Sequence, residues 1–87
     1  TEMKISFDPD SFEDFCQWPV YNKIVFKRLV QIIRDIKRDP FMGIGKPEPL
    51  KGNLQGYWSR RITEEHRLVY KVKSDEIFII SCRGHYI

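Results

Sequence analysis

The chain begins with an alternation of polar and apolar residues and then changes to a helical spacing. Residues 3–7 (MKISF) alternate, which is typical of a short strand. Asp8 follows and can cap a helix whose first residue is Pro9. Because proline interrupts the hydrogen bonds of a helix, we expect this first helix to end at Pro19.

A second, longer helix is predicted from about Asn22 to Arg38. Its apolar residues recur at intervals of three and four positions, as one face of a helix requires; they are Val25, Leu29, Ile32, Ile33 and Ile36. Pro40 ends this pattern. Prolines and glycines crowd residues 40–56, so we expect an irregular loop there. Loops of this length are uncommon in compact domains and often carry function.

Three strand-like runs close the chain, at residues 57–63, 66–72 and 76–85. The polar links between them are short enough for antiparallel hairpins. The order is one strand, two helices and three strands. This order predicts an α+β fold in which two N-terminal helices pack on one face of a small, mostly antiparallel sheet. The length favours a single domain over residues 1–87.

Alternation within the runs assigns side chains to the two faces of this sheet. The helix-facing sets are expected to be Trp58, Arg60 and Ile62; Leu68, Tyr70 and Val72; and Phe78, Ile80 and Cys82. The opposite face then gathers Arg61, Arg67, Arg83 and His85. The sequence therefore predicts a basic sheet face that carries a histidine near the end of the chain.

Composition narrows the class of protein only slightly. The 87 residues include 15 Lys and Arg against 12 Asp and Glu, which gives a net charge of +3 and makes an anionic partner plausible. The two cysteines, Cys16 and Cys82, form no close-spaced motif, so we expect a reducing cytoplasm and no disulfide scaffold. Neither the cysteines nor the histidines show the spacing of metal ligands. We therefore expect no metal, no cofactor and, from the short apolar runs, no membrane partner.

Glu48 is the first candidate for chemistry. It stands between Pro47 and Pro49 and is flanked by Lys46 and Lys51. Two prolines restrict the backbone around the carboxylate, as the positioning of a general base requires. A solvated loop carboxylate is the simpler interpretation of Glu48 taken alone.

His85 and Tyr86 are the candidates at the end of the chain. A lone histidine near a terminus is usually exposed and without a role, but nearby arginines favour an anionic ligand, and histidine suits proton transfer near neutral pH. Tyr86 can stack on a base or cap the sheet. A carboxylate, a histidine and arginines suffice to cleave RNA through its own 2′-hydroxyl group.

Two segments resemble a known family. They are KPEPLKGNLQGYWSRRITEEHRLVYKV at residues 46–72 and CRGHY at residues 82–86. Both are similar to the YoeB toxins of the RelE/ParE superfamily from bacterial type II toxin–antitoxin systems. The resemblance covers nearly the whole chain and implies a ribosome-dependent endonuclease that cuts messenger RNA and inhibits translation.

The resemblance also implies roles for individual residues. Glu48 would be the general base, His85 the general acid, and Arg67 would stabilise the transition state. The residues that would bind and orient RNA are Lys46, Lys51, Arg61, Arg83 and Tyr86, and Glu65 would support an arginine or the histidine. Two departures from the family pattern are Gly84, which replaces a bulky residue, and Ile87 beyond the usual end.

The implied partners are a cognate antitoxin of the YefM/Phd type, the 70S ribosome with its messenger RNA, and operator DNA reached only through the antitoxin. Formation of a homodimer stays open. Two alternatives remain at this point. One is a toxin that binds its target without nuclease chemistry, and the other is a co-repressor that acts only together with its antitoxin.

Overall fold

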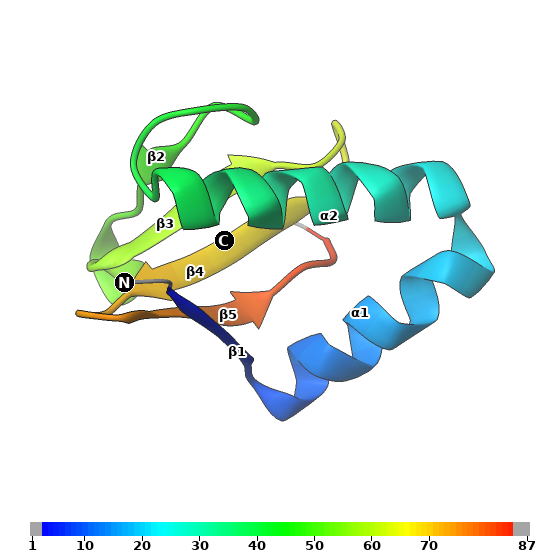
Figure 1. Cartoon of the computed structure of the whole chain (residues 1–87), viewed down its shortest axis with the longest axis horizontal. Coiled ribbons are helices and arrows are strands. Elements are labelled where there is room, and N and C mark those ends of the chain that lie inside the picture. The colour runs from blue at the N-terminus through cyan, green and yellow to red at the C-terminus, as the bar shows by residue number, and fades with distance from the viewer. Residues whose placement is uncertain (1–2, 85–87) are drawn as a thin grey trace.

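The structure is a computed structural model that describes residues 3–84 (Figure 1). Its elements are β1 (Lys4–Phe7), α1 (Pro9–Tyr21), α2 (Lys23–Arg38), β2 (Glu48–Pro49), a short 3-10 helix (Gly52–Leu54), β3 (Tyr57–Arg61), β4 (Arg67–Val72) and β5 (Glu76–Ser81). Within these residues, no helix combines the length and apolar composition that crossing a membrane requires.

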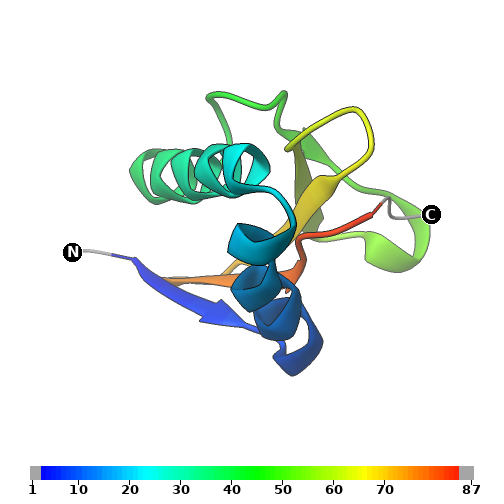
Figure 2. The ribbon, with the colours of Figure 1, turned by 90° about the vertical axis from the view of Figure 1, so that its right-hand side faces the viewer.

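The strands form one sheet in the order β1-β5-β4-β3-β2. β1 pairs with β5 in parallel, and the other neighbouring pairs are antiparallel. Helix α2 runs across the sheet and α1 lies beside the end of β1 and β5 (Figure 1), while the view from the side shows how strongly the sheet twists (Figure 2). The α+β fold predicted from the sequence is confirmed.

Helix α1 begins as the sequence predicts but ends later. The Asp8 side chain caps it by accepting a hydrogen bond from the backbone N–H of Asp10. The prediction that the helix ends at Pro19 is wrong, because the helix continues to Tyr21 with Pro19 inside it. Proline removes a single N–H here, close to the C-terminal end, and the N–H of Asn22 still closes the last turn on the Trp18 carbonyl.

Helix α2 follows the predicted spacing. Asn22 caps it by accepting hydrogen bonds from the N–H groups of the second and third residues of the helix, Ile24 and Val25. Leu29, Ile32 and Ile36 are fully buried, whereas Val25 and Ile33 are partly buried against the same core. The predicted apolar stripe is therefore the face that packs on the sheet.

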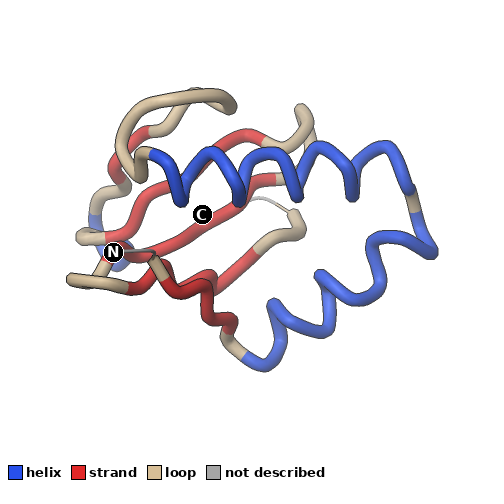
Figure 3. Tube along the Cα trace, in the orientation of Figure 1, coloured by secondary structure: helices blue, strands red, loops and turns tan. Residues whose placement is uncertain are grey.

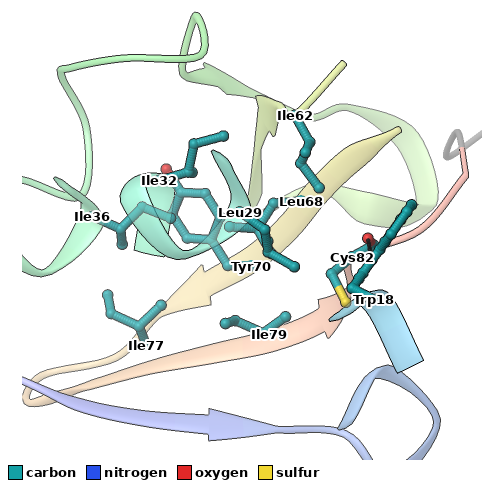
Figure 4. Packing of buried hydrophobic residues seen from close by; sticks show 10 residues of the cluster. All are labelled: Trp18, Leu29, Ile32, Ile36, Ile62, Leu68, Tyr70, Ile77, Ile79 and Cys82. Carbon is teal, nitrogen blue, oxygen red and sulfur yellow. Dashed lines mark hydrogen bonds between the residues drawn. The ribbon is translucent and has the colours of Figure 1, made fainter. Parts of the chain in front are cut away.

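The main hydrophobic core lies between α2, α1 and the sheet (Figure 4). It consists of Trp18, Leu29, Ile32, Ile36, Ile62, Leu68, Tyr70, Ile77, Ile79 and Cys82. Trp18 has a polar anchor as well, since its indole N–H donates a 3.0 Å hydrogen bond to the Cys82 carbonyl. This bond ties the segment after β5 to α1.

A β-bulge in β5 corrects the predicted faces of that strand. Val69 of β4 pairs with Ser81, but Tyr70 pairs with Ile79, so Ile80 is an extra residue on β5. The alternation reverses at this point. Ile79 and Cys82 consequently both face the core, and the prediction that Ile80 shares a face with Cys82 is wrong.

The core-facing residue near the start of β5 also differs from the prediction. Ile77 occupies the core where Phe78 was expected, and the ring of Phe78 instead lies 5.1 Å from the Lys73 ammonium.

The ends of the predicted elements in this half of the chain also need correction. The last strand ends at Ser81 and does not extend to residue 85. The predicted loop at residues 40–56 is not wholly irregular, since it contains β2 and the 3-10 helix. Pairing with β3 makes β2 an edge strand of the sheet.

Arg60 is fully buried and organises the loop after α2. Its guanidinium donates to the Asp35 carboxylate at 2.6 Å, to the Asp39 carbonyl at 2.6 Å and to the Ile44 carbonyl at 3.1 Å. Its Nε donates to the Tyr70 hydroxyl at 3.1 Å. The buried charge is therefore paired and its hydrogen-bond donors are occupied, which is the condition for burying an arginine.

Two glycines allow the loop to approach this arginine. A Cβ atom at Gly43 would lie 1.9 Å from Oδ2 of Asp35, and Gly45 has a φ of +79° and lies against the backbone of Arg61. The Gly45 carbonyl accepts a 2.6 Å hydrogen bond from the Arg61 N–H. These contacts fix the loop that Figure 3 shows between the end of α2 and β2.

The contacts of Asp35 change its protonation. Burial acts to raise the pKa of Asp35, but hydrogen bonds from Arg60 and Arg38 outweigh it and lower the pKa from 3.8 to about 2. A carboxyl group with a lowered pKa in the folded state stabilises the fold above pH 3.8. That contribution is lost as the pH falls through the folded value.

We predict that the Asp35 carboxylate contributes about 2 kcal/mol to the free energy of unfolding above pH 4, and that this is lost towards pH 2. The Asp35→Asn variant should be less stable than the wild type at pH 6 and should approach it at pH 2. Urea unfolding at a series of pH values measures both proteins. Asp75→Asn, at an exposed aspartate, is the control and should follow the wild type. An unchanging difference between wild type and Asp35→Asn would contradict the assignment.

Candidate functional site

Strand pairing places four residues on one face of the sheet, on the side opposite the main core. Glu48 of β2 pairs with Ser59 of β3, and Arg61 of β3 pairs with Arg67 of β4. Ser59 and Arg61 are two positions apart, so their side chains share a face. This agrees with the prediction that Arg61 and Arg67 lie together.

Glu48 and Arg67 are in contact. Nη1 of Arg67 lies 3.4 Å from Oε1 of Glu48, and β3 separates the two strands that carry these residues. The Glu48 side chain is 53% exposed and that of Arg67 only 16%. An accessible carboxylate thus lies beside a guanidinium that the sheet holds in place. We call the three residues Glu48, Arg61 and Arg67 the basic site.

Arg61 and Arg67 are direct neighbours across β3 and β4. Two like charges at directly opposite positions repel each other unless anions lie nearby. Glu64 lies 3.8 Å from the Arg61 guanidinium, and Glu48 lies 3.4 Å from the Arg67 guanidinium, so each arginine has a carboxylate nearby. An anionic ligand placed between the two guanidinium groups would interact with both, and phosphate matches the geometry of arginine well.

Lys46 and Lys51 lie on either side of β2 along the chain, and both are exposed. Lys46 has a φ of +51°, which is uncommon for a residue other than glycine. It follows directly after Gly45, the residue bonded to Arg61. The loop then enters β2, in which Glu48 pairs with Ser59 of β3.

The end of the described chain reaches this site through Gly84. The Arg67 N–H donates a 3.0 Å hydrogen bond to the Gly84 carbonyl, and the Gly84 N–H donates a 2.8 Å bond to Nδ1 of His66. His85 and Tyr86, predicted to be functional, lie outside the described residues. The chain nevertheless arrives at residue 84 in contact with the backbone of Arg67.

Arg83 is not part of the basic site. Its guanidinium lies 3.9 Å from Asp14 and 4.7 Å from the ring centre of Tyr21, and both of these residues belong to α1. The prediction that Arg83 lies on the face away from the helices is therefore wrong. The cause is the end of the strand at Ser81, because the alternation of a strand no longer applies to the residues that follow.

Glu65 is exposed, and its Oε1 lies 3.8 Å from Nε2 of His66. It was expected to support an arginine or His85, and the structure places it beside His66. Sequence analysis assigned no role to His66, which lies in the turn between β3 and β4. The sequence feature that could have drawn attention to His66 is its position directly before Arg67. Arg60 was likewise missed, although an arginine on the core-facing side of a strand requires a buried partner.

The site offers no evident place for a metal ion. Among the described residues, no three His, Cys, Asp or Glu side chains form a group that could hold one. Both cysteines are free thiols. Burial raises the pKa of the Cys82 thiol to about 12, so it is not a nucleophile at neutral pH. The described residues of the open face offer the chemistry of carboxylate, guanidinium and ammonium groups.

Ser59 forms part of the floor of this face. Its hydroxyl is buried and has no hydrogen-bond partner within residues 3–84. Val69, its partner on β4, is buried as well. The charged groups therefore surround a region of the sheet that excludes water, where electrostatic interactions are stronger than in solvent.

Comparison with known proteins gives consistent results. A sequence model for the family described as YoeB-like toxin of bacterial type II toxin-antitoxin system matches residues 7–86. Toxin YoeB of Mycobacterium bovis is 52% identical over 82 residues, which make up 94% of this chain and 96% of that protein. The similarity therefore extends over nearly the whole chain and is not confined to one motif.

Two solved structures show the same extent of similarity. A chain of the YoeB-YefM complex from Staphylococcus aureus has a TM-score of 0.88 and 46% identity, covering 99% of this chain and 100% of that chain. The YoeB dimer from Staphylococcus aureus has a TM-score of 0.90 and 45% identity, with the same coverage. The fold and the sequence thus lead to the same group of proteins.

We predict that the Glu48–Arg67 pair contributes little to stability. Exposed ion pairs contribute up to about 1 kcal/mol, so Glu48→Gln should change the free energy of unfolding by no more than that. Arg60→Met, which leaves the Asp35 carboxylate without its buried partner, should cost about 3 kcal/mol or more. Urea unfolding at pH 7 measures both. Equal losses in the two variants would show that Glu48 holds the fold together.

Proposed function

The chain belongs to the YoeB family of toxins from bacterial type II toxin–antitoxin systems, and we propose that it is a ribosome-dependent endoribonuclease that cuts messenger RNA. One observation carries the proposal. An accessible carboxylate, that of Glu48, lies 3.4 Å from the Arg67 guanidinium, with Arg61 directly opposite Arg67. A proton acceptor and two cations that could hold a phosphate are thus brought together.

The reaction uses the RNA's own nucleophile. Glu48 takes the proton of the 2′-hydroxyl group on the 5′ side of the scissile bond, and the 2′-oxygen attacks the adjacent phosphorus. Arg67 and Arg61 stabilise the negative charge that builds up on the pentavalent phosphate. His85 gives a proton to the departing 5′-oxygen as the P–O bond breaks. The products are a 2′,3′-cyclic phosphate and a 5′-hydroxyl end, and no metal is required to activate a nucleophile.

The remaining predicted residues have binding roles in this proposal. Lys46 and Lys51, both exposed beside β2, contact the RNA backbone. Tyr86 stacks on a base next to the scissile phosphate. Glu65 acts through His66, beside which it lies. Arg83 would reach RNA only from its position against α1, so its role is in binding at the margin and not in the reaction.

The shape of the site supports the proposed dependence on the ribosome. The basic site lies on an open sheet face, with its carboxylate 53% exposed. Such a face cannot by itself bend RNA so that the 2′-oxygen lies in line with the leaving oxygen. The ribosome would hold messenger RNA in the required geometry, and this arrangement supplies a large part of the rate enhancement.

The partner that restrains the toxin is proposed to be an antitoxin of the YefM type. The Staphylococcus aureus relative was solved as a YoeB-YefM complex, and another of its structures is a YoeB dimer. An acidic antitoxin segment would be attracted to Arg61 and Arg67 and would exclude RNA from them. Binding of operator DNA would then occur only through the antitoxin, and a homodimer is compatible with the same fold.

The competing functions make different demands on the site. A toxin that only binds its target does not need a carboxylate beside Arg67, and a co-repressor needs only the surface that meets the antitoxin. Both would retain their effect when Glu48 is replaced. The proximity of Glu48 to Arg67 therefore favours the nuclease.

We predict that Glu48→Gln, Arg67→Ala and His85→Ala each lower the rate of messenger RNA cleavage on ribosomes by about 10²- to 10⁴-fold. Each removes a proton-transfer or charge-stabilising group and leaves the core intact. Primer extension on a defined transcript measures the rate, and circular dichroism checks the fold. Asp75→Asn, in the turn between β4 and β5, is the control with unchanged cleavage. Full activity of a folded Glu48→Gln variant would exclude Glu48 as the base.

We predict a 2′,3′-cyclic phosphate and a 5′-hydroxyl as the first products, because the nucleophile belongs to the RNA. Mass spectrometry of the cut ends identifies them. A single 2′-deoxy substitution 5′ to the scissile phosphate should stop cleavage at that position and leave binding unchanged. EDTA should not affect the chemical step if the ribosome stays assembled. A 5′-phosphate product, or normal cleavage at the deoxy position, would rule out this mechanism.

A further inference from the structure

We propose that His66 is a positioning residue for the general acid: its imidazole holds the Gly84 amide and so fixes the point from which His85 extends. The inference rests on the function proposed above, in which His85 protonates the leaving oxygen. It concerns a different residue, one that does not touch the RNA.

The Gly84 residue is held from both sides by consecutive residues of the chain. Its N–H donates to Nδ1 of His66 at 2.8 Å, and its carbonyl accepts from the N–H of Arg67 at 3.0 Å. Arg67 is also the residue whose side chain contacts Glu48. The residue that precedes the proposed acid is therefore tied to the start of β4, which carries the proposed transition-state cation.

His66 is itself held firmly. Its ring packs edge-on against Trp18, with ring centres 4.8 Å apart and planes at 81°, and its side chain is only 17% exposed. The backbone N–H of His66 donates to the Thr63 hydroxyl at 3.1 Å, and its backbone carbonyl accepts from the N–H of Ile62 at 2.9 Å. A rigid imidazole can fix the amide that it binds, whereas a mobile one could not.

Trp18 holds the same segment two residues earlier. Its indole N–H donates to the Cys82 carbonyl at 3.0 Å, while its ring supports His66. Residues 82 and 84 are therefore both tied to a unit made of Trp18 and His66. We call the bonds to Cys82 and Gly84 the tail clamp, and the proposal assigns its functional part to His66.

The clamp acts where the sheet no longer holds the chain. Strand β5 ends at Ser81, and Gly84 has a φ of +76°, which breaks the extended conformation and is favourable for glycine. A Cβ atom at residue 84 would meet no neighbour within 4 Å, so side-chain packing does not hold this position. Hydrogen bonds to its backbone must therefore define its position.

The hydrogen bond identifies the form of the imidazole. Nδ1 accepts a hydrogen bond from a backbone amide, so it carries no proton itself, and the proton of the neutral ring lies on Nε2. Nε2 lies 3.8 Å from the Glu65 carboxylate, which favours a proton at that atom. Only a side chain with an acceptor at the place of Nδ1 can replace His66 in this role.

The test compares His66→Asn with His66→Gln. The Asn oxygen can occupy the place of Nδ1 and accept the Gly84 amide, whereas the Gln oxygen corresponds to Nε2 and cannot reach it. Both variants lose the same ring contact with Trp18, so they should lose similar stability. We expect His66→Gln to lower the single-turnover cleavage rate on ribosomes by about 10- to 100-fold with little change in KM, and His66→Asn to recover most of it.

A second measurement removes the other partner of the hydrogen bond. Ligation at Cys82 allows residues 82–87 to be added as a synthetic peptide in which the Gly84 N–H is replaced by an ester oxygen. This ester should slow the reaction about as much as His66→Gln. Combined with His66→Gln, it should cause little additional loss, because both changes remove the same bond. Fully additive losses would overturn the proposal.

Further outcomes separate this inference from the proposed function. Equal rates for the Asn and Gln variants, with an active wild type, would overturn the positioning role alone. A wild type that does not cleave RNA on ribosomes would overturn the proposed nuclease and with it any role of His66 in that reaction. Hydrogen exchange of the Gly84 amide gives a readout apart from activity: protection should be retained in His66→Asn and lost in His66→Gln. Loss in both, or in neither, would contradict the assigned bond.

Discussion

The buried guanidinium of Arg60 is the interaction on which the site depends. A charge without access to water is tolerated only when it is paired and hydrogen-bonded, and Arg60 obtains its partners from α2, from Tyr70 of β4 and from carbonyls of the loop after α2. These partners are distant in sequence, so the requirement draws a glycine-containing loop onto the sheet. The loop then continues directly into β2 and brings Glu48 next to Arg67. A buried structural charge thus sets the position of the exposed Glu48 carboxylate.

Neighbouring arginines have opposite roles because strand residues alternate between faces. Arg60 points towards the helices and is fully buried, whereas Arg61 points to the open face and keeps its charge accessible. The backbone N–H of Arg61 also bonds to Gly45 in the loop that Arg60 holds. One short strand therefore carries both a buried arginine that stabilises the fold and an accessible arginine for which we propose a binding role. Replacing Arg61 or Glu48 leaves the contacts of Arg60 intact, and so the site can vary while the fold persists.

Local patterns predicted much of this structure, and long-range contacts account for what they missed. The spacing of α2, the cap at Asp8 and the shared face of Arg61 and Arg67 follow from residues close in sequence, and all are confirmed. The bulge at Ile80 could not be predicted, since alternation says nothing about where a partner strand skips a residue. That one residue placed Ile77 and Ile79 in the core, where Phe78 and Ile80 were expected. The roles proposed for Glu48, Lys46, Lys51 and Tyr86 come from the family resemblance, and they stay predictions.

The energies of the tail clamp explain how one segment can be both well placed and displaceable. Cys82 is buried in the core, whereas Gly84 is held by two hydrogen bonds, to His66 and Arg67, each of which contributes about 0.5–1.5 kcal/mol net. Together these two bonds amount to about 1–3 kcal/mol, less than the 5–15 kcal/mol by which domains are typically stable. A partner that binds with nanomolar affinity gains about 12 kcal/mol, so it could release the tail and leave the sheet folded. A partner that competes for the backbone of Gly84 would therefore displace this residue without unfolding the sheet, because the same two bonds that position Gly84 are weak compared with such a binding energy.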